Sequence, residues 1–203
     1  MALANYADLQ TSVASWMNRT DLGAQIPDFI AIAEARINSV LRVREQVKTA
    51  SLSTVAGVQT VTLPADWLEF VALSTGGVPM ELGTSDGIRS RAAWYTASPL
   101  TPATIAIEGD TLLLSPTPDA VYVIDAQYYS KVPPLATSST NWLLTKHPNV
   151  YLYGALVSGY HFTMNDERAN FFGNLYAQAV AGVKASHVRA LSSGSPLTVR
   201  ARR

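Results

Sequence analysis

The spacing of apolar residues changes twice along this chain, and each change marks a change of secondary structure. Apolar residues recur every three or four positions from Tyr6 to Met17 and again from Ile26 to Leu41, a period that predicts two amphipathic helices. Asn5 can cap the first helix, and Pro27 and Asp28 suit the first turn of the second. A glycine separates the two segments, so we expect a helical hairpin.

Beyond residue 46 the period shortens to two, which is typical of strands with one buried face. The expected strands cover residues 47–53, 58–63, 68–73, 104–107, 111–114 and 122–129. In the last of these, apolar and aromatic residues occupy one face, while Asp125 and Gln127 occupy the other. We expect a half-buried antiparallel sheet. Residues 83–104 show little periodicity, which favours a short helix followed by a long loop.

Helical periods return in the last third of the chain. Val150 to Phe162 is apolar on nearly every face, which indicates a helix buried inside a bundle or against another subunit. Phe171 to Val183 carries a regular apolar stripe, and its pattern ends near Arg189, before a run of serine, glycine and proline. Neither helical pair can bury its stripe alone, so the two pairs should pack together.

These patterns predict an α+β protein, with a helical bundle formed by the N- and C-terminal helices and an antiparallel β domain inserted between them. The expected parts are a helical bundle of residues 1–46 and 141–190, an inserted β-rich domain of residues 47–140, and an extended basic C-terminal arm of residues 191–203. A chain of 203 residues with 48% hydrophobic content can bury the core that such a fold requires.

The composition also limits where such a protein is made and what chemistry it can perform. The absence of cysteine excludes disulfides, thiolate metal sites and a cysteine nucleophile, and it fits synthesis in a reducing cytoplasm. We expect no signal peptide, because no basic segment followed by an apolar one opens the chain. We expect no membrane span either, because the longest apolar stretch is shorter than the ~20 residues needed to cross a bilayer.

The three histidines are the first candidates for chemistry, and each has a structural explanation. His161, Asp166 and Glu167 resemble a metal-binding cluster, yet Asn165 followed by two acidic residues is also the pattern of a helix start. His147 precedes a proline just before a helix, and His187 lies late in the last helix, where positive charge complements the dipole. Nucleophile-elbow and phosphate-binding motifs are missing, so we expect no catalytic residue, cofactor or metal.

Aromatic residues gather in the C-terminal third, where they could be taken for a base-stacking platform. The set consists of Trp142, Tyr151, Tyr153, Tyr160, Phe162, Phe171, Phe172 and Tyr176. A platform for nucleic acid needs interleaved basic residues, and only Lys146 and Arg168 lie nearby in the sequence. Packing in the core or in a subunit interface is the better interpretation.

The formal net charge of zero conceals an uneven distribution along the chain. Residues 1–167 hold all 15 acidic residues and nine basic ones, whereas residues 168–203 hold six basic residues and no acidic one. Such asymmetry predicts a basic terminal arm directed at an acidic partner, although a solvated tail is the alternative. The expected partner-binding residues of the arm are Leu197, Thr198, Val199, Arg200, Arg202 and Arg203. The first three have strand character and can add to a sheet edge, while the arginines orient the arm.

Several stretches, taken together, resemble one protein family. They are Ile26 to Asn38, Leu63 to Glu69, Tyr128 to Leu135, Asn141 to Leu144 and His147 to Leu156. In order and spacing they are similar to the head-to-tail adaptor, or connector, proteins of tailed bacteriophages. About half of the chain takes part in the resemblance, and residues 74–103 have no counterpart in it. None of these stretches is catalytic, so the specificity of the resemblance lies in the whole sequence.

The resemblance implies a structural virion protein at the neck of the particle, made in the host cytoplasm. Proteins of this kind form a homo-oligomeric ring, usually of twelve copies, on the portal protein, and bridge it to the downstream tail or nozzle protein. Genomic DNA passes transiently through the ring, and no membrane is involved. The arm would then be the portal-docking segment. A nucleic-acid-binding module using the basic arm is the alternative, although such modules are normally basic overall and this chain is neutral.

Overall fold

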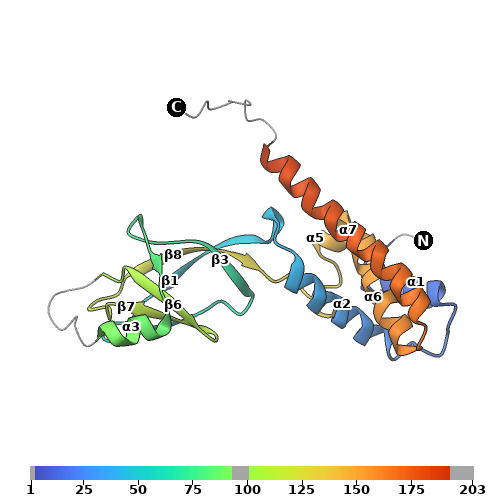
Figure 1. Cartoon of the computed structure of the whole chain (residues 1–203), viewed down its shortest axis with the longest axis horizontal. Helices are drawn as coiled ribbons and strands as arrows, with labels where there is room; N and C mark the ends of the chain where they lie inside the picture. The colour runs from blue at the N-terminus through green and yellow to red at the C-terminus, as the bar shows by residue number, and fades with distance from the viewer. Residues whose placement is uncertain (1–2, 93–100, 193–203) are drawn as a thin grey trace. The chain divides into compact units, whose positions relative to one another are not determined.

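The computed structural model describes residues 3–92 and 101–192 of the chain (Figure 1). The chain divides into two compact units, one made of Met1–Glu45 with Val132–Arg203 and the other of Gln46–Lys131. The first contains helices and the second contains the strands, so the expected α+β class is confirmed, with a β region inserted between N- and C-terminal helices. We call them the helical unit and the β unit.

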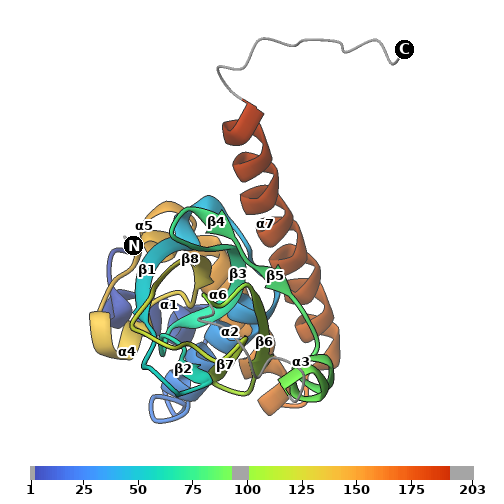
Figure 2. The ribbon, with the colours of Figure 1, turned by 90° about the vertical axis from the view of Figure 1, so that its left-hand side faces the viewer.

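The helical unit is built from helices that come from both ends of the chain. Its elements are α1 (Tyr6–Met17), α2 (Ile26–Val40), α4 (Leu135–Ser138), α5 (Trp142–Lys146), α6 (Pro148–Phe162) and α7 (Asp166–Ser192). A short 3-10 helix, η1 (Arg44–Gln46), follows α2 at the junction with the β unit. Helix α7 is the longest helix among the described residues and lies beside α6 (Figure 2).

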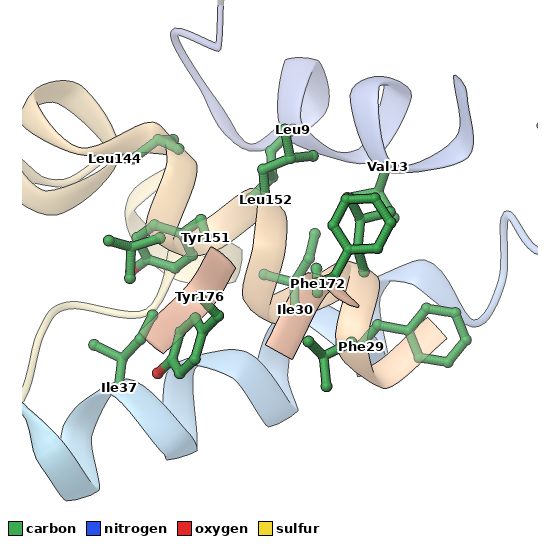
Figure 3. Packing of buried hydrophobic residues seen from close by; sticks show 14 of the residues in the cluster. Leu9, Val13, Phe29, Ile30, Ile37, Leu144, Tyr151, Leu152, Phe172 and Tyr176 are labelled. Atoms are coloured by element: carbon green, nitrogen blue, oxygen red, sulfur yellow. The ribbon is translucent and has the colours of Figure 1, made fainter. Parts of the chain in front are cut away.

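Helix α6 is the centre of the helical unit, because α1, α2, α5 and α7 all pack against it (Figure 3). Its apolar residues face neighbours on nearly every side, as its sequence predicts, and Tyr151 is completely buried. Helices α1 and α2, the expected hairpin, contact each other less than each of them contacts α6. Both bury their apolar stripes on α6. A single core results, to which every long helix of the unit contributes.

Two glycines of α6 allow the neighbouring helices to approach closely. A β-carbon at Gly154 would lie 3.0 Å from Cβ of Ala33 in α2 and 3.3 Å from the ring of Tyr176 in α7. At Gly159 it would lie 2.6 Å from Sδ of Met17 in α1. Small residues at these positions therefore set how near α1, α2 and α7 come to the central helix.

Local signals place the helix ends where the sequence predicts them. The side-chain oxygen of Asn5 accepts a hydrogen bond from the amide of Asp8 at 2.9 Å, which caps α1. The amide of Arg168 donates to Asn165 at 3.1 Å, which caps α7. Both predicted caps are thereby confirmed, and Pro27, expected at the first position of α2, is its second residue.

The described residues of the β unit form two four-stranded sheets rather than the single sheet that the alternation predicts. The strands are β1 (Val47–Ser53), β2 (Thr60–Thr62), β3 (Trp67–Thr75), β4 (Val78–Pro79), β5 (Glu81–Leu82), β6 (Thr104–Glu108), β7 (Thr111–Ser115) and β8 (Val123–Ser130). The first sheet has the order β1-β8-β3-β4, and the second has the order β2-β7-β6-β5. All pairs are antiparallel except β5 and β6, which run parallel.

A small core lies within the β unit. Ile124 and Ala126 of β8 point inward while Asp125 points out, as the alternation predicts. They meet Leu112 and Leu114 of β7, together with a few further apolar residues of β2, β3 and β6. Helix α3 (Ser85–Ala92), the short helix expected in this region, packs on the second sheet through Ile88, which contacts β6 and β7.

Candidate interaction surfaces

The expected metal-like cluster is the start of a helix. Asn165 caps α7, and the side chains of His161 and Asp166 come no closer than 3.9 Å, both exposed to solvent. Glu167 is also exposed and continues the acidic first turn of α7, where negative charge stabilises the helix dipole. In the described part of the chain, no three histidine, aspartate or glutamate side chains are placed to hold a metal ion.

The other two histidines hold local structure. His147 lies between α5 and α6, where its amide donates to Leu143 and its carbonyl accepts from the amide of Val150, consistent with the predicted turn. Nδ1 of His187 accepts a hydrogen bond from the amide of Arg44 at 3.1 Å. This contact ties α7 to the segment after α2, a role that sequence reasoning missed because the partners lie 143 residues apart.

A hollow on the first sheet of the β unit is one place where a substrate could bind. It measures about 480 Å³ and is lined by small side chains of β1, β3 and β8. Ser51 donates to Asp125 at 3.1 Å in this hollow. The β unit contains no histidine, however, so a serine there has no imidazole base within its own unit.

A polar cluster fixes the segment that returns from the β unit to the helices. The amide of Leu135 donates to Glu34 at 2.8 Å, and that of Val132 donates to Asn38 at 2.9 Å. Asn141 caps α5 through Leu144 and also donates to the hydroxyl of Tyr151 at 2.7 Å. The cluster therefore pins residues 132–144 to α2 and α6.

Burial raises the pKa of Glu34 in this cluster, although the bond from Leu135 partly opposes the shift. Burial likewise raises the pKa of Tyr151. Asn141 before an apolar run was a visible capping signal in the sequence, whereas nothing around Glu34 indicated its partner, because hydrogen bonding to a distant backbone amide leaves no local pattern.

Most of the aromatic set forms the core, as predicted. Tyr151, Tyr160, Phe172 and Tyr176 are buried, and the rings of Tyr160 and Phe172 stack with centroids 5.4 Å apart. Arg168 lies over the Tyr160 ring, with its guanidinium carbon 5.6 Å from the ring centre. These rings are occupied by one another, so they are not a free platform for bases.

Four large apolar side chains near the α6–α7 turn remain exposed, and we call them the turn patch. They are Trp16 (51% exposed), Phe162 (56%), Met164 (90%) and Phe171 (59%). The rings of Trp16 and Phe171 both contact Phe172, which joins the patch to the core. Such a group of exposed apolar residues is typical of a protein interaction surface.

The predicted arm residues Leu197, Thr198, Val199, Arg200, Arg202 and Arg203 lie outside the described residues. Helix α7 ends at Ser192, immediately before them, and no helix in the described ranges is both long and apolar enough to cross a membrane. The role of the arm therefore stays a prediction from its sequence.

Comparison with known proteins gives a context for these surfaces. No curated protein matches the chain. A family model, described as SU10 adaptor protein, matches residues 4–200, which is nearly the whole chain. This match includes both units, is consistent with a phage structural adaptor and suggests a role without catalysis. From the match over residues 4–200 it follows that the chain belongs to the SU10 adaptor protein family.

Proposed function

We propose that this protein is a head-to-tail adaptor of a tailed bacteriophage. In this proposal it assembles as a ring of twelve copies on the portal protein, connects the capsid to the downstream tail or nozzle protein, and lines the channel through which DNA leaves. The observation that carries the proposal is the family match over residues 4–200. The virion neck is the corresponding location.

Ring formation is supported by the surface of the helical unit. In a closed cyclic ring each copy uses one patch to meet a different patch on the next copy, so every subunit must expose two complementary surfaces. The turn patch supplies one apolar surface, with Trp16 and Phe171 anchored on the buried ring of Phe172. Exposed aromatic side chains of this kind are frequent energetic centres of protein interfaces.

Portal docking is assigned to the C-terminal arm. Residues 193–203 combine serine, glycine and proline with one short strand-forming stretch and three arginines. A segment of this composition gains order when its backbone pairs with a sheet edge on a partner and its arginines meet acidic groups. Truncation after Leu191 removes this segment and leaves every residue of the helical core in place.

The test is co-sedimentation of the purified protein with its portal. Full-length protein should bind the portal, and protein truncated after Leu191 should bind far more weakly. Replacement of Arg200, Arg202 and Arg203 by Gln should give an intermediate loss that shrinks as salt rises, because charges are screened beyond ~8 Å at physiological ionic strength. Equal binding of full-length and truncated protein would refute docking through the arm.

The same preparations test the alternative of a nucleic-acid-binding module. An adaptor should show the same mass with and without duplex DNA at moderate salt, because the folded part of the chain is not basic. Strong, salt-sensitive DNA binding without any portal binding would favour the alternative instead.

A further inference from the structure

An apolar groove runs along the β unit between its two sheets. It has a volume of about 350 Å³ and is lined by residues 67–73 of β3, by Met80 and Leu82, and by Ile105 and Ile107 of β6. Leu73 and Ile105 are buried and form its floor, whereas Leu82 is 71% exposed at its rim. The groove therefore offers apolar surface to a partner without disturbance of the core.

Both strands that border the groove have open edges. Strand β3 pairs with β8 on one side, but on the other side β4 covers only Ser74 and Thr75, and the amide of Met80 donates to the carbonyl of Leu73. Strand β6 pairs with β7 on one side, while β5 covers only Thr104 and Ile105 on the other. In the described ranges no strand continues either pairing along the groove. Open edges next to an apolar floor are the arrangement that binds an added strand.

Trp67, which lines the groove, also has a polar group without a partner. The indole Nε1 of Trp67 is buried and has no hydrogen-bond acceptor among the described residues. Its ring packs against Phe70, 5.3 Å away between centroids, so both residues form one wall of the groove. An unpaired buried N–H is unfavourable, and a carbonyl from an added strand could supply the acceptor once the ring adjusts.

The charge of the β unit defines what kind of strand would bind. Residues 46–131 contain eight acidic and four basic residues, which gives this unit a net charge of −4. Glu69 is exposed and lines the groove itself. A partner strand should therefore have small or β-branched apolar side chains and be flanked by basic residues.

The chain itself carries a segment with these properties. We propose that the groove binds Leu197, Thr198 and Val199 from the C-terminal arm of a second copy as an added strand, with Arg200 and the arginines after it directed at the acidic β unit. The eleven residues after α7 span up to ~36–40 Å when extended, so the arm is long enough to form an added strand. Arm to groove is a heterologous contact, so it repeats from copy to copy in a ring.

This proposal adds a second partner for the arm to the proposed function. Before docking, the arm is held by another copy, and the portal competes for it. The arm is thereby kept from binding other open strand edges until the portal arrives.

The direct test uses a fluorescent peptide of residues 195–203 and the protein truncated after Leu191, which has no competing arm. The peptide should bind, and Leu82→Lys should weaken binding at least tenfold by placing a charge on the rim of the groove. Val78→Lys is the matched control, because Val78 is 67% exposed in the same unit but does not line the groove. Absent peptide binding, or equal loss in both variants, would overturn the proposal.

Two further peptides separate strand addition from attraction by charge alone. Thr198→Pro removes a backbone donor and should weaken binding, because proline cannot take part in the ladder at that position. A peptide of the same composition in scrambled order keeps every arginine and should also bind weakly. If the scrambled peptide bound as well as the natural one, charge alone would account for binding and the groove would not be a strand site.

Failure of the groove proposal can be distinguished from failure of the proposed adaptor function. Full-length Leu82→Lys protein should still dock on the portal, because docking uses the arm and not the groove. A variant that binds the portal but not the peptide supports both proposals. Peptide binding without portal docking of the natural protein would contradict the adaptor function and leave the groove proposal standing.

Discussion

The helical unit and the β unit bury their apolar residues in different ways. Among the residues that the structure describes, the helical unit has one core of 26 buried residues, most of them from helices at both ends of the chain. The described part of the β unit has one cluster of eight buried residues and a separate cluster of three, and two of its strands have partly open edges. The helical unit therefore offers a partner exposed side chains on a closed core, whereas the β unit also offers its backbone.

The two units also differ in how a carboxylate is held. Burial raises the pKa of Glu34 in the helical unit. In the β unit burial pushes the pKa of Asp66 up as well, but hydrogen bonds from Lys48 and Tyr128 outweigh it, and the pKa falls below its ordinary value. The charged form of Glu34 is disfavoured by its surroundings and that of Asp66 is favoured, so these two carboxylates should contribute to the pH dependence of stability in opposite directions.

The largest expected effect tests the single core of the helical unit. Ile37→Ala removes a side chain that is 1% exposed and should cost about 2–5 kcal/mol of unfolding free energy. Ile32→Ala lies on the same helix but is 50% exposed, so it should change stability by less than about 0.5 kcal/mol. Urea denaturation followed by circular dichroism measures both. Equal midpoints for the two variants would show that α2 does not bury this face.

A smaller effect is expected from two glycines that differ only in their surroundings. Gly154→Ala would bring its β-carbon to 3.0 Å from Cβ of Ala33, and the clash should cost about 1–3 kcal/mol. Gly173→Ala in α7 meets nothing within 4 Å, so the gain in helix propensity should stabilise the protein by about 0.5–1 kcal/mol. The midpoint of thermal unfolding should fall for Gly154→Ala and rise for Gly173→Ala. A stabilising Gly154→Ala would mean that α2 and α6 are not in close contact.

The smallest effects should follow pH. The folded pKa of Glu34 is raised, so its contribution is present below the unfolded value near 4.5 and is lost as pH rises through the folded pKa. Glu34→Gln keeps an acceptor for Leu135. The variant should therefore gain stability relative to the natural protein at pH 7, and the gain should be smaller at pH 4. Thermal midpoints at both values measure this. A constant difference between variant and natural protein would contradict the shift.

Asp66→Asn should show the reverse. The folded pKa of Asp66 is lowered, so its stabilisation is present above the unfolded value near 3.8 and is lost as pH falls through the folded pKa. The variant should be less stable than the natural protein at pH 7, and the difference should shrink in acid. The effect is expected to be modest, because the Lys48–Asp66 pair is partly exposed. If the stability difference between the variant and the natural protein grew in acid, the pKa of Asp66 would not be lowered in the folded state.

Local patterns predicted the long helices well, because periodicity and caps are written within a few residues of each other. Asn5 and Asn165 mark helix starts that the structure confirms. The sequence does not predict the short helices α4 and α5, because four or five residues are too few to show a period. Glu34 and Asn38 hold the start of the 132–144 segment to α2 through contacts that leave no sequence signal, because the partners lie 101 and 94 residues apart.

The division of the strands into two sheets could not be predicted from alternation. Each strand shows which of its faces is buried, but not which strand it pairs with. Strand β8 pairs with β1 and β3, while the β6–β7 hairpin recruits β2 and the two-residue strand β5. The groove between β3 and β6 arises from this pairing, so it was invisible in the sequence, whereas the strand character of Leu197, Thr198 and Val199 was visible.

The mass of the purified protein, measured by light scattering with and without its portal, tests the adaptor function most directly. The account predicts that the portal binds many copies, about twelve per portal ring, and that truncation after Leu191 weakens this assembly. A protein that stays monomeric in the presence of the portal, or that adds a single copy per ring, would contradict the account.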